Sequence, residues 1–336
     1  MNNQPDLLSV GDASIDVFLT PTQSEALCQI NTKECYIAFS YGEKIPVRNL
    51  EFSVGGNAAN NAVGTTRLGV KTGLVLTLGD DAGGNQIIEG LKKEGVDLTY
   101  VIQQPASSSN FSVVVNYGGE RTIFSYHAPR SYEFPVQLPV TPWVYLTSMG
   151  ESFRPFYNHV VEWLKVNPSI KLAFNPGSWQ LKAGYEGIKD VLALTYLVFV
   201  NREEAEALVG LKESAGKEKD LLMALSKLGP KVCVITDGNN GSFIYDSGVT
   251  DGTRFVRAEV LPVDAYERTG AGDAFGSGCL TALIKGKSLE EALVWGTVNS
   301  ASVIGYVGPQ KGLVKEGEMQ EWVARYKSSG VKVEEF

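Results

Sequence analysis

Short apolar runs alternate along the chain with longer segments in which apolar residues recur every three or four positions. The short runs are typical of buried strands, and the periodic segments are typical of amphipathic helices. The predicted strands are 7–11, 73–79, 96–102, 143–147, 171–174, 196–200, 232–236, 242–245 and 254–261. The predicted helices are 57–68, 86–94, 153–166, 203–209, 219–228, 274–284 and 289–304. This alternation predicts an α/β fold with a mostly parallel central sheet and helices on both faces.

Two segments depart from the alternation, because they are rich in strand-like runs and show no clear helix. They are residues 17–52 and 106–130. We expect them to form one small β-rich lid on the α/β body. The predicted α/β core then consists of residues 1–16, 53–105 and 131–336.

The clearest pattern within these segments is a β-hairpin. Residues 111–117 and 121–127 are strand-like and flank Gly118 and Gly119, a pair suited to a tight turn. Residues 37–47 predict a further extended piece.

The composition is that of an ordinary globular protein. The 336 residues are 43% hydrophobic and 20% charged, which argues against disorder and fibrous structure. The net charge of −8 and the pI near 5.1 argue against partners such as nucleic acid or an anionic membrane. An acidic protein still binds phosphate where backbone N–H groups converge.

We expect a cytoplasmic protein, because the sequence shows neither a membrane-spanning run nor a secretory signal and its cysteines suggest no disulfide framework. The longest apolar run, 191–200, is about half of what a membrane-spanning helix needs, and the first 15 residues lack the features of a secretory signal. We expect the cysteines to be reduced, and a zinc site is disfavoured because no CxxC pair occurs. The cysteines and histidines concerned are Cys28, Cys35, Cys233, Cys279, His127 and His159.

The strongest chemical signal is the segment 269–275, Thr-Gly-Ala-Gly-Asp-Ala-Phe, which opens an apolar helix. The small residues Gly270, Ala271 and Gly272 let a phosphate approach N–H groups at the helix start, where the helix dipole favours anions. Asp273 would repel that phosphate unless it serves as a general base for an attacking hydroxyl. The alternative is a tight turn in which Asp273 caps the helix.

Two further segments combine glycine or a carboxylate with a strand end. Gly55 and Gly56 lie at a strand-to-helix junction where a ligand could touch the backbone, and Asn60 would face the same cavity with an amide suited to hydroxyl groups. Close helix–sheet packing explains the same glycines. Asp16 follows the first strand, at the edge where open α/β sheets bind ligands, although a turn role is equally compatible.

Two other strand ends carry polar residues or glycines. Asn201 and Glu204 share one side of a helix start, and together they could hold a hydrated Mg²⁺ or form a capping box. The segment 236–241, with Thr236, Gly238 and Gly241, predicts a turn between two strands.

Taken in order along nearly the whole chain, these motifs resemble the PfkB/ribokinase family of ATP-dependent sugar and nucleoside kinases. The resemblance implies a three-layer α/β/α sandwich with a β-rich lid over the substrate. It implies Asp273 as catalytic base and Gly270, Ala271 and Gly272 as the anion hole. The residues implied to hold substrate hydroxyls are Asp16, Gly55, Gly56 and Asn60. The residues implied to serve ATP and Mg²⁺ are Asn201, Glu204, Thr236, Gly238, Gly241 and Asn299.

The chain departs from the family pattern at two positions next to the anion hole. Glu267 stands where the family usually has Asp, and Arg268 stands where a small residue is common. The usual Asp helps many members to bind a monovalent cation, and Arg268 could take over the electrostatic role of that cation beside the phosphates. A surface Arg268 paired with Glu267 is the alternative.

We therefore expect an ATP- and Mg²⁺-dependent kinase that phosphorylates a primary hydroxyl of a small sugar. A nucleoside kinase is the nearest alternative, because the segment between Asp16 and Gly55 is longer than a compact ribokinase-type lid needs. Its aromatic residues could stack on a base or form a small core of the lid; they are Phe18, Tyr36, Phe39 and Tyr41. A catalytically silent sensor is the alternative from another class. Pairing of two lids predicts a homodimer, since exposed strand edges are usually covered.

Overall fold

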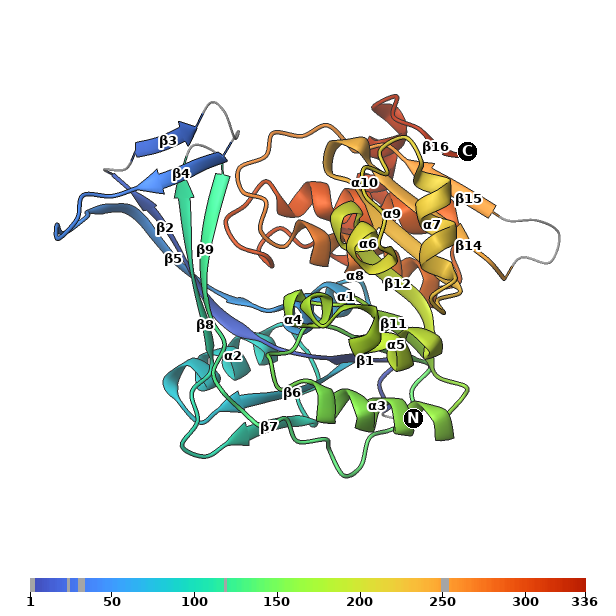
Figure 1. Ribbon diagram of the computed structural model, residues 1–336, viewed down its shortest axis with the longest axis horizontal. Coiled ribbons are helices and arrows are strands. Elements are labelled where there is room, and N and C mark those ends of the chain that lie inside the picture. The colour runs from blue at the N-terminus through green and yellow to red at the C-terminus, as the bar shows by residue number, and fades with distance from the viewer. Residues whose placement is uncertain (1–3, 23–24, 30–33, 118–119, 249–253) are drawn as a thin grey trace.

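The computed structural model describes residues 4–22, 25–29, 34–117, 120–248 and 254–336. The body of the molecule contains one large sheet. Its strands are β1 (Leu7–Val10), β6 (Thr72–Gly79), β7 (Val101–Gln104), β10 (Trp143–Leu146), β11 (Lys171–Phe174), β12 (Thr195–Asn201), β13 (Val232–Thr236), β14 (Ser242–Asp246), β15 (Arg254–Ala258) and β16 (Val333–Glu335). They lie in the order β16-β15-β14-β13-β12-β11-β10-β1-β6-β7 (Figure 1). Pairing is parallel from β7 to β13 and antiparallel from β13 to β16.

Helices cover both faces of this sheet. They are α1 (Asn57–Arg67), α2 (Ala82–Lys93), α3 (Arg154–Val166), α4 (Ser178–Lys182), α5 (Gly184–Leu194), α6 (Arg202–Val209), α7 (Glu218–Ser226), α8 (Ala271–Ile284), α9 (Leu289–Val303) and α10 (Glu316–Ser328). Side chains of α3, α5, α6 and α7 belong to one buried cluster, and those of α8, α9 and α10 belong to another. The fold is the predicted three-layer α/β/α sandwich.

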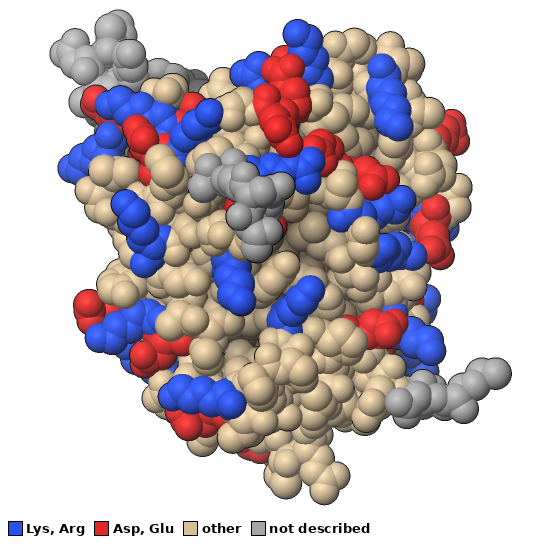
Figure 2. Space-filling model, turned by 90° about the vertical axis from the view of Figure 1, so that its right-hand side faces the viewer, with Lys and Arg blue, Asp and Glu red and all other residues tan. Residues whose placement is uncertain are grey.

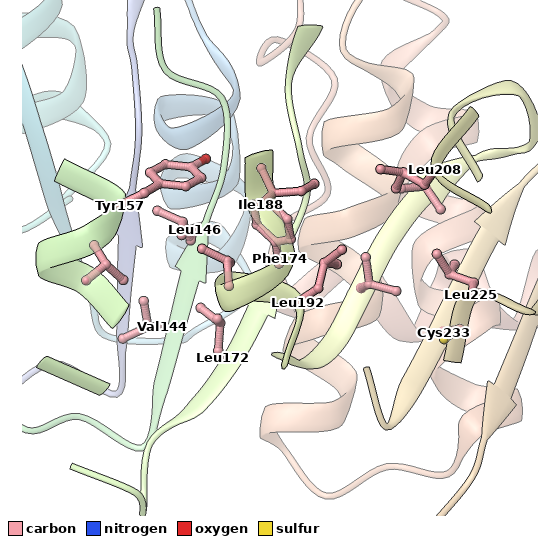
Figure 3. Close-up of a cluster of buried hydrophobic side chains, with 14 of the residues drawn as sticks. Val144, Leu146, Tyr157, Leu172, Phe174, Ile188, Leu192, Leu208, Leu225 and Cys233 are labelled. Atoms are coloured by element: carbon pink, nitrogen blue, oxygen red, sulfur yellow. The ribbon is translucent and has the colours of Figure 1, made fainter. Parts of the chain in front are cut away.

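The two clusters are separated by the alternation of side chains along the strands. In β10, Val144 and Leu146 belong to the cluster under α3 and α5, whereas Trp143 and Tyr145 belong to the opposite one. Figure 3 shows the first cluster, in which strand residues such as Phe174 pack beneath helical side chains. Because both faces are buried, the central strands are apolar throughout, which is why they were recognisable in the sequence.

A second, four-stranded sheet stands apart from the body and is called the lid here, together with the hairpin at its far end (Figure 1). Its strands are β2 (Ser14–Pro21), β5 (Val47–Gly55), β8 (Asn110–Tyr117) and β9 (Glu120–Tyr126), in the order β5-β2-β8-β9. The hairpin consists of β3 (Glu25–Gln29) and β4 (Glu34–Ala38). The predicted lid segments 17–52 and 106–130 fall on these sheets.

Each face of the lid has a distinct character. The face toward the body carries Asp16, Phe18 and Thr20 from β2, and cross-strand register places Asn116 and Arg121 beside them. The opposite face is apolar, and five of its side chains are between 40% and 59% exposed. They are Leu50, Phe52, Phe111, Phe124 and Tyr126.

A buried polar cluster joins the lid to the body. Tyr132 Oη and the Gly150 N–H donate to Asp12 Oδ2 over 2.8 and 3.1 Å. The Arg130 guanidinium donates to Asn110 Oδ1 at the start of β8 over 3.3 Å. Burial raises the pKa of Asp12 to about 6. The chain segments that enter and leave the lid therefore share one hydrogen-bonded network.

Several predicted elements differ from those observed. Residues 96–100 form an irregular segment with a single β-bridge at Asp97 and a turn at 99–100, and β7 begins at Val101. The predicted extended piece 37–47 is mostly loop, with a turn at Gly42, where φ is 78°. Asp16 does not follow a core strand but lies within lid strand β2. The predicted turn at Gly118 and Gly119 lies outside the described residues.

Over the described part of the face in Figure 2, basic and acidic side chains are interspersed. Among the described residues, no helix combines the length and apolar character needed to cross a bilayer. Cys233 and Cys279 are buried free thiols, and the side chains of Cys28 and Cys35 lie outside the description.

Candidate active site

The start of α8 has the backbone geometry of an anion site. Gly270 precedes the helix with φ 79°, a left-handed conformation that glycine adopts without strain. A Cβ at this position would lie 2.4 Å from Cβ of Pro309, so the close approach of these two segments also requires glycine. The Gly272 N–H belongs to the first turn and has no partner within the helix, and the Ala271 N–H donates to the Arg268 carbonyl over 3.3 Å. Both residues line a cavity.

Asp273 occupies the third position of the same helix and is held by α1. Asn60 Nδ2 donates to Asp273 Oδ2 over 2.7 Å, and Gln310 Nε2 donates to Asn60 Oδ1 over 3.0 Å. The two hydrogen bonds join α1, α8 and the loop that follows α9. The Asp273 side chain therefore has a single defined position beside the anion-binding turn.

The protonation of Asp273 is set by its surroundings. Removal from water raises its pKa to about 6, and the nearby carboxylates of Asp16 and Glu204 act in the same direction. The hydrogen bond from Asn60 acts in the opposite direction, because it stabilises the charged form. A carboxylate with a pKa near 6 is ionised at neutral pH and is more basic than an ordinary aspartate, as a general base needs to be.

Asp16 faces the same region from the lid. Its carboxylate is buried and accepts a hydrogen bond from Ser14 Oγ at 2.8 Å. Burial raises its pKa. A Cβ on Gly55 would lie 1.9 Å from Asp16 Oδ2, so the absence of a side chain at Gly55 makes room for this carboxylate. Glycine is required at position 56 by packing instead, because a Cβ there would lie 2.5 Å from Cα of Ala13.

Asn201 and Glu204 form the capping box that the sequence allowed. The Glu204 N–H donates to Asn201 Oδ1 over 2.8 Å, and the Asn201 N–H donates to Glu204 Oε2 over 2.9 Å. Burial raises the pKa of Glu204. Within the described part of the chain no hydrogen bond engages Glu204 Oε1.

A cavity of about 330 Å³ extends from the anion-binding turn along the sheet edge. Thr236, Gly238 and Gly241, to which the family resemblance gives a role in ATP binding, line it together with Arg268. The rest of the wall is largely apolar and comes from the loop after β15 and from α9. It includes Val260, Leu261, Val263, Ala301 and Ile304. The cavity is polar where it meets the helix N-terminus and apolar at its other end. This combination, in a cavity of this volume, suits a nucleotide.

Asn299 is not part of this cavity, which corrects the predicted ATP contact. Its side chain is fully buried; Nδ2 donates to the Ala274 carbonyl over 2.7 Å, and Oδ1 accepts from the Val314 N–H at 2.9 Å. The cavity is lined from α9 by residues on the neighbouring face of the helix, such as Thr297 and Ser300. Asn299 thus fastens α8 and α9 together behind the site.

Glu267 and Arg268 do not pair with each other. Glu267 Oε1 accepts from the Thr269 N–H at 2.7 Å, and Nε of Arg121, on lid strand β9, lies 4.0 Å away. Glu267 Oε2 is buried without a partner among the described residues. Arg268 is exposed and lines cavities on both of its sides. Sequence reasoning missed Arg121 and Gln310, because neither belongs to a recognisable motif.

Known proteins place this arrangement in a family. A sequence model described as pfkB family carbohydrate kinase matches residues 5–316. An ATP-dependent 6-phosphofructokinase of Thermoanaerobacterium thermosaccharolyticum is 26% identical over 314 residues, which cover 90% of this chain and 89% of that protein. A nucleoside kinase of Methanothermobacter thermautotrophicus is 24% identical over 330 residues, 95% of each chain.

A solved structure supports the same assignment at the level of fold. The structure of Arabidopsis thaliana ribokinase complexed with ribose and ATP superposes with a TM-score of 0.77 at 22% identity and covers 95% of this chain and 99% of that one. The chain belongs to the pfkB family of carbohydrate kinases. It is therefore a kinase with an ATP-binding site, related to enzymes that act on sugars and on nucleosides.

The position of Asn299 generates a test of its structural role. Asn299→Ala leaves the buried Val314 N–H without its partner and removes one of the donors to the Ala274 carbonyl, which also accepts from Ser277 Oγ, so the free energy of unfolding should fall by about 1–3 kcal/mol. The KM for ATP should stay near that of the unaltered protein wherever the variant is folded. Ser300→Ala, on the cavity side of the same helix, is the control and should be close to neutral in stability. A large rise in the KM for ATP with unchanged stability would instead place Asn299 in the nucleotide site.

Proposed function

We propose that the protein transfers the γ-phosphoryl group of ATP to a primary hydroxyl of a small sugar. The observation that carries this proposal is the juxtaposition of Asp273, with its pKa raised to about 6, and the open N-terminal turn of α8. Asp273 supplies a base for the attacking hydroxyl, and the turn supplies N–H groups that stabilise the charge on the transferred group.

The residues around Asp273 supply orientation. Asn60 fixes the carboxylate by its 2.7 Å hydrogen bond, so Asp273 Oδ1 is left to accept the proton of the substrate hydroxyl. Asp16 presents a second carboxylate from the lid, which suits two neighbouring hydroxyls of a sugar. Gly55 leaves the room that this carboxylate itself occupies. Bound between these groups, a hydroxyl would lie in line with the phosphoryl group held at Gly270, Ala271 and Gly272.

Magnesium fits the site as a hydrated ion. No group of three or more His, Cys, Asp or Glu side chains in the described residues could hold a metal by itself. Mg²⁺ usually keeps several waters and binds through one or two carboxylates and the phosphates of a nucleotide. Glu204 Oε1 would provide such a carboxylate contact, with Asn201 beside it, and the ion would neutralise phosphate charge during transfer.

A nucleoside is the second candidate substrate, favoured by the size of the lid and by the nucleoside kinase among the relatives. Phe18 lines a cavity at the lid face next to Asp16 but is only 2% exposed, so it offers little surface for stacking on a base. Phe39 and Tyr41 are exposed and do not form a core of the lid. A silent sensor would not need the carboxylate and the anion-binding turn together, so we disfavour that function.

The direct test is ADP formation by the purified protein with Mg²⁺ATP and a panel of pentoses, hexoses, their derivatives and nucleosides. Sugar-dependent ADP formation, with the phosphate on a primary hydroxyl of the product, is the expected result. Turnover with nucleosides alone would favour the second candidate. Binding of ligands without any ADP formation would favour the sensor and reject the proposal.

Replacement of the proposed base separates catalysis from structure. Asp273→Asn keeps the shape of the side chain and an oxygen for Asn60, but it removes the basic oxygen, so kcat should fall at least about 10²-fold. The KM for ATP should change little, because the lost charge only repelled phosphate. Asp190→Asn, an exposed position on α5, controls for the loss of one carboxylate. A variant that keeps more than about a tenth of kcat on the true substrate would reject Asp273 as the base.

The same substitution should stabilise the protein at neutral pH. The pKa of Asp273 is about 6 in the folded state and near 3.8 in the unfolded chain, so ionisation of the carboxylate weakens folding progressively as the pH rises from about 4 to about 6. Asp273→Asn should therefore raise Tm at pH 7.5, by the equivalent of about 1–3 kcal/mol, and the gain should be small at pH 4, where Asp273 is protonated in the folded protein and partly protonated in the unfolded chain. Thermal unfolding at both pH values measures this. A lower Tm of the variant at pH 7.5 would contradict the raised pKa.

We propose further that the protein is a homodimer formed through the lids. The outer lid face exposes five large apolar side chains over adjacent strands, an area that a solitary chain would leave in water. Light scattering at about 10 µM should give twice the 36.4 kDa of one chain. Phe52→Lys, at a side chain 58% exposed, should give the single-chain mass without loss of fold. A single-chain mass for the unaltered protein would reject the dimer.

A further inference from the structure

A second cavity lies beside the proposed sugar site and is not explained by phosphoryl transfer. It measures about 390 Å³ and separates the inner face of the lid from residues 266–268. Phe18 and Thr20 of β2 form its floor, so it continues outward along the lid from Asp16. A ligand that places one hydroxyl between Asp16 and Asp273 would extend into this space with its other end.

Three arginines from separate segments line this cavity: Arg48 from β5, Arg121 from β9 and Arg268 from the loop before α8. Arg48 reaches it because of a β-bulge. Asn49 pairs with Thr20 and Val47 pairs with Pro21, so Arg48 is the unpaired extra residue of β5. Regular alternation would direct its side chain to the outer face, and bulges commonly redirect a side chain in this way.

The acidic groups of the cavity do not neutralise these arginines. Glu267 Oε1 accepts from Thr269 and lies no closer than 4.0 Å to Arg121. Glu51 lies 3.8 Å from Lys311, which is outside the lining. Among the described residues, the ion pairs of arginine involve neither Arg48 nor Arg268.

Three guanidinium groups whose only carboxylate partner among the described residues is Glu267, 4.0 Å from Arg121, are unusual in a chain of net charge −8. The other ion-paired arginines of the described residues each have a carboxylate within 3 Å. Guanidinium groups present forks of donors that match the two or three oxygens of a carboxylate or phosphate. Arg268 also lines the nucleotide cavity and would be engaged by ATP. Arg48 and Arg121 line only the lid cavity, so their charge is available to the acceptor substrate.

We infer that the acceptor sugar carries an anionic group, a carboxylate or a phosphate, at the end remote from the phosphorylated hydroxyl. Arg48 and Arg121 bind this group across the lid cavity while Asp16 holds hydroxyls in between. The inference rests on the proposed function for the identity of the acceptor site. It places substrate selection on the lid strands rather than on the anion-binding turn of α8. It predicts that the enzyme discriminates against neutral sugars and nucleosides.

The experiment compares matched pairs that differ chiefly in the anion: fructose with fructose 6-phosphate, and glucitol with gluconate. Titration calorimetry in the presence of Mg²⁺ and a non-hydrolysable ATP analogue gives the Kd of each probe, and ADP formation is measured in parallel. At least one anionic member should bind 10-fold or more tightly than its neutral partner. Arg48→Gln and Arg121→Gln should each weaken binding of that anionic probe about 10-fold or more, while affinity for the neutral partner and for ATP changes little.

Arg257→Gln is the matched control, because Arg257 is an exposed arginine on β15, outside the residues that line the lid cavity. The two parallel readouts separate failure of this inference from failure of the proposed function. Binding of an anionic sugar through Arg48 and Arg121 without turnover keeps the anion site and rejects the kinase reaction. Turnover of neutral sugars with no anionic preference keeps the kinase reaction and rejects the anion site. Absence of binding for both anionic probes at millimolar concentration also rejects it.

Discussion

The hydrogen bond from Asn60 to Asp273 is the contact on which the active site depends. It joins α1 to α8 over 2.7 Å, and Gln310 extends it to the loop after α9. Asn60 and Asp273 are 213 residues apart in the chain, and only the packing of the sandwich brings them together. The bond also moderates the pKa of a carboxylate that burial and two neighbouring carboxylates drive upward. The contact with Asn60 thus fixes the position of Asp273 and limits the rise of its pKa, whereas burial causes that rise.

The sandwich was largely predictable because its strands and helices have distinct hydrophobic periods. The strands Lys171–Phe174 and Val232–Thr236 coincide with their predicted bounds. Helix α5 was missed because it ends at Leu194 and β12 begins at Thr195, so one apolar run contains both without a turn residue. Helix α10 was missed because only Met319 and Tyr326 are buried, too few for a visible apolar stripe.

The role of a site residue was predictable where it depends on neighbouring residues in the chain. It was not predictable where it depends on contacts with distant segments. The left-handed Gly270 and the capping box of Asn201 and Glu204 follow from short-range patterns. Asn299 suggested a ligand contact but satisfies backbone groups of two other segments, a role that spacing does not reveal. The inward turn of Arg48 depends on a bulge in strand pairing and leaves no mark in the sequence.

The pH dependence of kcat/KM tests the central claim most directly, in the unaltered enzyme and in Asn60→Ala. The account predicts that activity of the unaltered enzyme falls as pH drops through about 6, where Asp273 takes up a proton. Loss of the Asn60 hydrogen bond removes a contact that stabilises the charged carboxylate, so the acidic limb should move to higher pH in the variant. An acidic limb at the same pH in both enzymes would contradict the claim that Asp273, positioned by Asn60, is the base.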